Sequence, residues 1–537
     1  MTILKTKYTQ LKTDLANVKN TARLAVALPQ FFRRRITLQQ AQEGVKKLLD
    51  TRVERFLELA RAQIYARKDS PYRALLKRAG CEFADLQTQV RSRGLQETLV
   101  KLAGEGVYFT ADEFKGKTPV VRGKVAFRVS PNDFGIRDLT AGTTIYSSGT
   151  RNAPIKTYSP VESQTERAMG EGVFLSAHGL LDRAHAVYEP VIAGRLHFIL
   201  INGKLGIPTE RWFSFNMSVH GALEAKYHEW NARLVALMGR WFGSGVANPQ
   251  YLAAGDFKPV VDWVREKKLK GIGCCITTVV SNATRIARVA METRCSLEGT
   301  SFIASGEPLT HAKKQLIEQS GARVAARCGI GEGIGALLGC GSPDSIDEMH
   351  VPESIFALFE NPRVLDFTGS RIHPLMITTL QALTPRFLLN VENGDYATML
   401  ERNCGCALQR AGFTRHIHTI RSFEKFTSEG VNYSGTDLFE LLENSIPAEF
   451  GGAPGDYQLV EEEDGNGQSR LTLMVHPSVG DLDEENLISR LQRGLAQGSR
   501  NHRFMTMIWR DAGTFRIKRE APLASARGKI LPLHIKH

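Results

Sequence analysis

A run of hydroxyl-bearing and small residues, Tyr146–Pro154, has the composition of a phosphate-binding loop. Backbone N–H groups and the hydroxyls of Ser147, Ser148 and Thr150 can surround a polyanion. Gly149 lets the chain approach such an anion closely. An ordinary surface turn can have the same composition. The loop therefore indicates a nucleotide only if other residues can hold the rest of it.

Three charged residues later in the chain could complete such a site. Glu332, in a glycine-rich segment, supplies a carboxylate for Mg²⁺, a hard cation that prefers oxygen ligands. Asp395 can accept hydrogen bonds from both hydroxyls of a ribose. Lys529 can stabilise the charge that develops between a carboxylate and an α-phosphate. Each of them could also be a solvated residue at a turn, so only their combination indicates nucleotide chemistry.

Three cysteines and one histidine form a second constellation, independent of the first. Nine residues separate Cys340 from His350, and Cys404 and Cys406 follow with one residue between them. Three thiolates and one imidazole are a normal ligand set for tetrahedral Zn²⁺. Four unrelated buried side chains are the alternative, because free cysteine is common in protein cores. The pattern favours a structural zinc ion, held by four ligands and without a catalytic role.

The apolar pattern of the central part of the chain predicts the elements that hold these residues. Residues 300–304 indicate a buried strand, and residues 323–327 indicate a second one. Between them, Thr310 can cap a helix that ends before Gly321. A strand, a helix and a strand with short connections imply a parallel pair with a right-handed crossover.

Both predicted strands should end at the same edge of the sheet. Gly306, Glu307 and Pro308 follow the first strand, and Gly329 follows the second. Ligands of open α/β sheets bind outside the carboxyl ends of the strands. We therefore expect these four residues to face one ligand.

The chain is expected to be an α/β protein, with a large N-terminal domain of helices and of mixed and parallel sheets. Residues 1–115 are expected to be its helical region, and residues 116–421 its α/β core. A third apolar strand in this core, residues 386–391, should bring Asp395 to the ligand edge. Residues 422–537 should form a small, mobile α+β domain on a hinge.

The order of these segments resembles that of the adenylate-forming superfamily of acyl-CoA synthetases, luciferases and nonribosomal adenylation domains. The similarity is greatest to phenylacetate–CoA ligase-like members and to acyl-protein synthetases. Ser70–Tyr72 resembles an N-terminal segment of these enzymes, Tyr146–Pro154 their phosphate loop and Arg527–Lys529 their last motif. The resemblance covers nearly the whole chain.

The resemblance implies a role for each matched residue. Glu332 would hold Mg²⁺, and Lys529 would serve the adenylation step. Asp395 would bind the ribose hydroxyls, and Arg421, at the hinge, would contact the ribose as well. The remaining contacts to the nucleotide would come from the phosphate loop and the two strand ends, namely Ser147, Ser148, Gly149, Thr150, Gly306, Glu307, Pro308 and Gly329.

The resemblance extends to the proposed metal ligands. Phenylacetate–CoA ligase-like enzymes have a similar cysteine and histidine after the element that Glu332 matches. They also have a similar Cys-x-Cys after the Gly-Asp pair that Gly394 and Asp395 match. It therefore implies zinc bound by the same four residues, which are Cys340, His350, Cys404 and Cys406.

The chain also departs from the family pattern. Arg151 and Asn152 replace the usual Thr-Gly of the phosphate loop, and Lys156 is displaced by one residue. Cys328 replaces the adenine-stacking tyrosine, and Gly331 replaces a threonine. These changes bear on nucleotide binding more than on the fold. They motivate an alternative function, that of a degenerate, non-catalytic, zinc-containing relative that binds a nucleotide or a partner.

The expected reaction is ATP-dependent activation of a small carboxylic acid. The carboxylate would attack the α-phosphate of Mg·ATP and give an acyl-adenylate and pyrophosphate. The acyl group would then pass to coenzyme A, to an amine or to the thiol of a carrier protein. ATP, Mg²⁺ and a structural Zn²⁺ are the expected cofactors.

Composition sets limits on other functions. No window approaches about 20 consecutive apolar residues, so no membrane span is expected. The net charge of +13 permits nucleic-acid binding, but its spread without long basic blocks favours an enzyme of ATP or coenzyme A. The polar N-terminal segment does not resemble a secretory signal, which predicts a cytoplasmic protein with reduced cysteines.

Overall fold

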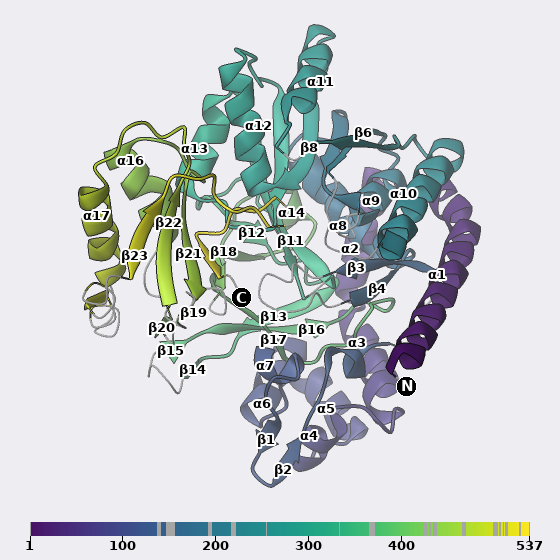
Figure 1. The fold of residues 1–537 in the computed structure, drawn as a ribbon. Coiled ribbons are helices and arrows are strands. Elements are labelled where there is room, and N and C mark those ends of the chain that lie inside the picture. The colour runs from purple at the N-terminus through teal and green to yellow at the C-terminus, as the bar shows by residue number, and fades with distance from the viewer. Residues whose placement is uncertain are drawn as a thin grey trace.

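The computed structural model describes most of the chain, as Figure 1 shows. The described residues are 2–136, 141–146, 156–191, 196–215, 222–253, 255–331, 333–364, 371–422, 427–428, 431–432, 438–463, 469–497, 503, 506–507, 510, 514–525 and 528–535. No helix within these ranges has the length and apolar character needed to cross a bilayer.

A twelve-stranded mixed sheet forms the centre of the fold (Figure 1). Its strands, in their order across the sheet, are β13 (Phe356–Glu360), β16 (Pro374–Thr379), β17 (Val391–Glu401), β18 (Arg415–Ser422), β12 (Met349–His350), β11 (Gly335–Gly339), β10 (Arg323–Ile330), β9 (Thr300–Ser305), β8 (Cys274–Val279), β5 (Ala184–Tyr188), β6 (Thr209–Phe215) and β7 (Pro249–Leu252). The pairs from β10 to β7 are parallel, and those from β10 to β13 are antiparallel. The predicted α/β class is confirmed.

The predicted strand–helix–strand unit is also confirmed. β9 and β10 are parallel, with Ser305 opposite Arg327. The helix between them, α13 (His311–Gln319), begins after Thr310, whose side chain accepts a hydrogen bond from the N–H of Lys313. β10 continues to Ile330, so Gly329 lies within the strand and not after it.

The prediction of a third strand at residues 386–391 is wrong. Strand β17 begins only at Val391 and contains Asp395 in its interior. The segment before it is irregular, and Asn390 has a positive φ of 52°. The Asn390 side chain donates to the carbonyls of Leu99 and Val107. An apolar run indicates burial, and here the buried chain is held by side-chain hydrogen bonds and by isolated backbone bonds, such as that from the N–H of Phe387 to the carbonyl of Phe134, and not by a continuous strand ladder.

Helices cover both faces of the parallel half of the sheet. Cys274 packs in the cluster formed with α11–α13, whereas Cys275 packs in the cluster formed with α2 and α8. Successive side chains of a strand point to opposite faces, so both faces of a covered sheet are apolar. The first cluster contains residues of α11 (Lys258–Leu269) and α12 (Val280–Glu292) as well as α13, and the second contains residues of α2 (Leu38–Asp50), α8 (Ser163–Ala177) and α14 (Ala407–Arg410). Three further helices, α1 (Thr2–Arg33), α9 (Leu196–Lys204) and α10 (Ala222–Phe242), share a buried cluster with Val187 of β5 and Trp212 of β6.

The N-terminal helices do not have a core of their own. Phe56, Leu99 and Phe134 belong to one buried cluster that also contains Leu358 and Ile420 from the antiparallel half of the sheet. The helices of this region are α3 (Arg52–Ala60), α4 (Arg73–Arg78), α5 (Phe83–Arg93), α6 (Leu95–Gly104) and α7 (Ala111–Phe114). Packing therefore joins the two ends of the large N-terminal part.

The C-terminal part has a separate core. Its buried cluster contains only residues between Leu438 and Leu533. Figure 1 shows these elements, coloured from green to yellow, at one side of the molecule. They are a four-stranded sheet and its helices, namely β23 (Phe515–Lys518), β22 (Ser469–Val475), β21 (Tyr457–Glu463), β24 (Leu533–Ile535), α15 (Leu438–Glu440), the π-helix η5 (Leu441–Ser445), α16 (Ile446–Phe450) and α17 (Glu484–Ala496).

Candidate active site and metal centre

The segment after β9 lies at the carboxyl edge of the parallel strands, as predicted from the sequence. Gly306 has a positive φ of 85°, a conformation that favours glycine. The side chain of Glu307 turns inward and is 1% exposed. Its Oε1 accepts a hydrogen bond from the N–H of Ser281 at 3.0 Å. Because this carboxylate is used within the protein, the exposed surface of the segment is mainly its backbone.

Lys529 lies directly against this segment, although it is more than 200 residues away in the sequence. A Cβ atom at Gly306 would be 2.9 Å from Cε of Lys529. Lys529 is only 6% exposed. Two residues that the sequence assigned to one site are therefore brought into contact.

Gly329 provides open space beside half-exposed Cys328. It pairs with Ala336 of β11, and a Cβ atom at Gly329 would meet nothing within 4 Å. Gly329 itself is exposed, whereas Ile330 is buried. A planar ring could therefore approach the backbone here without displacing a side chain.

Asp395 and Arg421 lie on neighbouring strands. Asp395 pairs with Ser422, and the next residue of β17 pairs with Arg421. The amide of Asn393 donates to Oδ2 of Asp395 at 3.0 Å. Nη1 of Arg421 is 3.4 Å from Oδ2 of Asp347. The two predicted ribose-contacting residues thus have neighbouring polar groups that orient them.

A cavity of about 390 Å³ lies where Arg421 faces the C-terminal part. Its volume is in the range that holds small molecules. The ring of Phe439 lies 5.4 Å from the guanidinium of Arg421. The cavity is lined by Leu309, Thr310, His311, Ala312, Asp344, Ser345, Ile346, Asp347, Thr419, Arg421, Phe439, Glu440, Glu443 and Asn444.

Five of the predicted site residues are not among the described residues. They are Ser147, Ser148, Gly149, Thr150 and Glu332. The predicted phosphate loop lies between β3 (Gly142–Tyr146) and β4 (Lys156–Pro160), which are antiparallel, with Tyr146 opposite Lys156. The assignments of these five residues remain sequence-based predictions.

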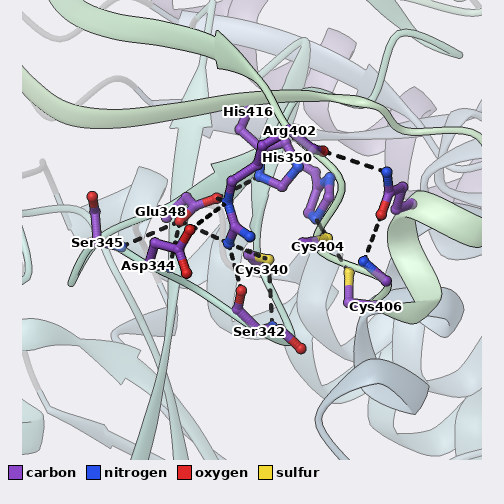
Figure 2. A network of polar contacts seen from close by, with 12 residues as sticks. Cys340, Ser342, Asp344, Ser345, Glu348, His350, Arg402, Cys404, Cys406 and His416 are labelled. Carbon is purple, nitrogen blue, oxygen red and sulfur yellow. Dashed lines mark hydrogen bonds and ion pairs between the residues drawn. The ribbon is translucent and has the colours of Figure 1, made fainter.

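The four predicted metal ligands come together at the antiparallel half of the sheet (Figure 2). The ligand atoms of Cys340, His350, Cys404 and Cys406 all lie within 4.8 Å of one another. Nε2 of His350 is 3.2 Å from Sγ of Cys406 and 3.6 Å from Sγ of Cys404. Residues more than 60 positions apart in the sequence thus meet with the ligand atoms that suit Zn²⁺.

The surroundings of His350 suit metal binding. Its Nδ1 is 2.7 Å from the carbonyl of Phe413, which accepts a hydrogen bond from Nδ1–H. That bond selects the tautomer whose bare Nε2 faces the sulfur atoms. The hydrogen bond from Cys340 lowers the pKa of Cys406, with the contact to His350 acting in the same direction. A lowered pKa favours the thiolate, which is the form in which cysteine binds zinc.

A second layer of polar contacts holds the segment between the first two ligands (Figure 2). Burial would raise the pKa of Glu348, but hydrogen bonds from Arg402 and from the N–H groups of Asp344 and Ser345 lower it to about 2. The Arg402 contact is 2.7 Å long. Nδ1 of His416 lies 2.5 Å from Oε1 of Glu348. These contacts fix the loop that leaves Cys340 and returns at the neighbouring strand.

No protein-family model matches the sequence, and no curated protein matches it. Among solved structures, the chain is similar to 2-hydroxyisobutyryl-CoA ligase in the postadenylation state in complex with 2-HIB-AMP. The TM-score is 0.50, with 15% identity over 91% of this chain and 89% of that chain.

The chain shares its overall fold with this ligase. Two further structures have TM-scores of 0.41. They are ATP-bound MatB from Rhodopseudomonas palustris, at 12% identity over 89% of this chain and 90% of that one, and the amide bond synthetase McbA from Marinactinospora thermotolerans, at 11% identity over 96% and 98%.

Four residues that contact the predicted site residues were not found from the sequence. Ser281, Lys313 and Glu443 surround Glu307 or its neighbours, and Asp347 contacts Arg421. None of them lies in a motif, and their spacing in the sequence gives no signal. Only the charge of Lys313, at a helix position that is buried, indicates a partner, because buried lysines are rare unless they are paired.

Proposed function

We propose that the protein activates a carboxylic acid by adenylation, with Lys529 as the catalytic lysine. The carboxylate oxygen would attack the α-phosphate of ATP, the bond to the bridging oxygen would break, and pyrophosphate would leave. The buried position of Lys529 against Gly306 carries this proposal. An ammonium group at a dry strand end can stabilise the charge that develops at the α-phosphate.

The nucleotide would lie along the carboxyl edge of the sheet. Exposed Gly329 and partly exposed Gly306 and Pro308 would face the base, and Glu307 supports the segment of Gly306 and Pro308 from inside the protein. The phosphate contacts of Ser147, Ser148, Gly149 and Thr150 and the Mg²⁺ contact of Glu332 are part of the proposal on sequence grounds alone.

The ribose would be bound between Asp395 and Arg421. Asp395 is oriented by Asn393, and Arg421 faces the cavity. Arg421 also marks the proposed hinge, because the separate core begins at Leu438. We therefore propose a mobile C-terminal domain for residues 422–537 and an N-terminal domain for residues 1–421, comprising the helical region 1–115 and the core 116–421.

The acyl acceptor would be coenzyme A, an amine or a carrier-protein thiol. Rotation of the C-terminal domain would remove Lys529 from the reaction centre and admit the acceptor. None of the eight cysteines, all of which lie within the described residues, is in a disulfide bond. The proposed location is cytoplasmic.

A structural Zn²⁺ fits the four clustered ligands. The ligand set is complete without a water, and His350 already has the tautomer that binds a metal. Cys340, His350, Cys404 and Cys406 would hold the ion and brace the strands beside the cavity. The ion would supply cohesion and no catalytic step.

ATP–pyrophosphate exchange with a panel of carboxylic acids tests the proposed function. Wild-type protein should exchange with at least one acid, and Lys529→Ala should lower kcat by about 10²- to 10³-fold. Lys518→Ala, which removes an exposed lysine of the same part of the chain, is the matched control. ATP binding without exchange for any acid would instead support the non-catalytic alternative.

A further inference from the structure

Two of the contacts between the C-terminal part and the large part share one buried carboxylate, that of Glu307. The first contact is made by the segment around Lys529, and the second is made by the π-helix η5. Ser281 links Glu307 to the first contact, and Lys313 links it to the second.

On the side of Lys529, the link is the hydroxyl of Ser281. This hydroxyl donates a hydrogen bond to Oε2 of Glu307 at 2.5 Å. It also accepts a hydrogen bond from the N–H of Ile530 at 3.2 Å. A serine hydroxyl has one proton and two lone pairs, so giving its proton to the carboxylate leaves it as an acceptor. Glu307 therefore orients Ser281 to receive the residue that directly follows Lys529.

On the side of η5, the link is Lys313. Its Nζ is 3.7 Å from Oε2 of Glu307 and 2.7 Å from Oε1 of Glu443. The hydroxyl of Thr310 donates a second bond to Glu443, at 2.5 Å. The side chains of Lys313 and Glu307 are each 1% exposed, so solvent does not screen their interaction.

The packing around Lys529 leaves little freedom for another arrangement. A Cβ atom at Gly528 would be 2.7 Å from Oδ1 of Asn282, the neighbour of Ser281. Backbone bonds within the segment, from the N–H of Ser525 to the carbonyl of Lys529 at 2.8 Å, keep it compact. The segment thus meets the start of α12 as a close-fitting unit, and Ser281 supplies its hydrogen-bond partner.

We propose that Ser281 and Glu307 are positioning residues, which place Lys529 at the α-phosphate through the N–H of Ile530. Glu307 also joins this contact to η5 through Lys313, so that both points of contact form together. The inference rests on the proposed role of Lys529 in adenylation. It assigns to Glu307 a role in domain placement that differs from direct nucleotide binding.

A double-mutant cycle between Ser281 and Lys529 tests the proposal. Ser281→Ala should lower kcat for ATP–pyrophosphate exchange by about 10-fold, the equivalent of one hydrogen bond, and leave KM for ATP within about twofold of wild type. In a Lys529→Ala background the same change should have less than a twofold effect, because the residue acts through that lysine. Ser281→Thr, which keeps the hydroxyl, should restore most of the rate.

The matched control is Ser320→Ala. It removes a buried hydroxyl that donates a hydrogen bond to the carbonyl of Ile317, at the end of its own helix. It should leave the exchange rate unchanged. Equal losses from Ser281→Ala in both backgrounds would overturn the proposal, as would a wild-type rate in the single variant. If Ser281→Ala does not fold, Glu307→Gln in the same two backgrounds decides by the same criterion.

Failure of the proposed function gives a different result. An unimpaired Lys529→Ala variant would overturn the assignment of the lysine, and the positioning proposal with it. A large fall in the exchange rate of Lys529→Ala, together with an equal fall from Ser281→Ala in both backgrounds, would overturn the positioning proposal alone.

Discussion

The ion pair between Arg288 and Asp456 offers a direct test of how the C-terminal part is held. Arg288 lies on α12 of the large part, and Asp456 directly precedes β21 of the C-terminal sheet. Nη1 and Nη2 of Arg288 donate to the two oxygens of Asp456 at 3.0 and 2.8 Å. We expect Arg288→Ala to favour arrangements in which the two parts have separated.

The geometry sets the size of the effect. The Asp456 side chain is 5% exposed and that of Arg288 is 28% exposed, so the pair is intermediate between a surface and a buried one. Surface pairs contribute up to about 1 kcal/mol, and loss of one partner of a buried pair costs about 3–5 kcal/mol. Asp456 keeps the hydrogen bond from the N–H of Ala453, which lowers the cost. An intermediate cost of about 2–3 kcal/mol corresponds to a roughly 30- to 150-fold change in the equilibrium.

Single-molecule energy transfer between dyes on α11 and α17 measures this equilibrium as the ratio of the two populations. Arg288→Ala should change the ratio by the stated factor. Lys258→Ala is the matched control, because it breaks an ion pair with Asp262 whose side chains are 69% and 41% exposed. An unchanged ratio in Arg288→Ala, or an equal change in the control, would refute the assignment of this pair as an interdomain contact of that strength.

Three further outcomes are expected. Removal of the proposed zinc ion by a chelator should let iodoacetamide modify half-exposed Cys404, as detected by mass spectrometry. Cys275 should stay unmodified, because burial raises the pKa of its thiol. Burial lowers the pKa of His185, so the unfolded chain binds more protons than the folded one as the pH falls below about 6.5. The free energy of unfolding should then fall by up to about 1.4 kcal/mol per pH unit. His185→Gln should reduce this slope, measured by urea unfolding at several pH values. Gly306→Ala should displace Lys529 and lower the exchange rate, because its Cβ would be 2.9 Å from Cε of that lysine.

Each of these outcomes has a control or a contradicting result. Gly80→Ala also replaces a glycine of positive φ, but it meets no atom within 4 Å and should not affect exchange. Modification of Cys404 in the zinc-loaded protein would contradict its role as a ligand. An unchanged pH slope in His185→Gln would show that another group dominates acid destabilisation.

The sequence predicted the parts of the fold that depend on local signals. The helix after Thr310 has a capping residue and an apolar spacing, and β9 and β10 are short apolar runs on either side of it. The run at residues 386–391 failed because burial alone does not produce a strand. The irregular path there depends on the tertiary contacts of Asn390, which no local pattern encodes.

For the candidate site, the sequence predicted the residues whose chemistry is distinctive and missed the common ones. Cysteine and histidine are rare and chemically distinctive, so the cluster of Cys340 and His350 with the later cysteines could be proposed from residue type. Ser281 and Glu443 could not, because serine and glutamate are common on surfaces and gain their roles only through packing.

The shared core of the N-terminal helices has a consequence for synthesis of the chain. Phe56 and Leu99 are buried against Leu358 and Ile420, which the ribosome adds roughly 300 residues later. At about 5–20 residues per second, the apolar faces of these helices lack their native partners for about 15 to 60 s. Helices α3 to α7 are thus made early and buried late, and a nascent chain of this protein should engage chaperones through residues 52–114 before strands β13 and β18 are made.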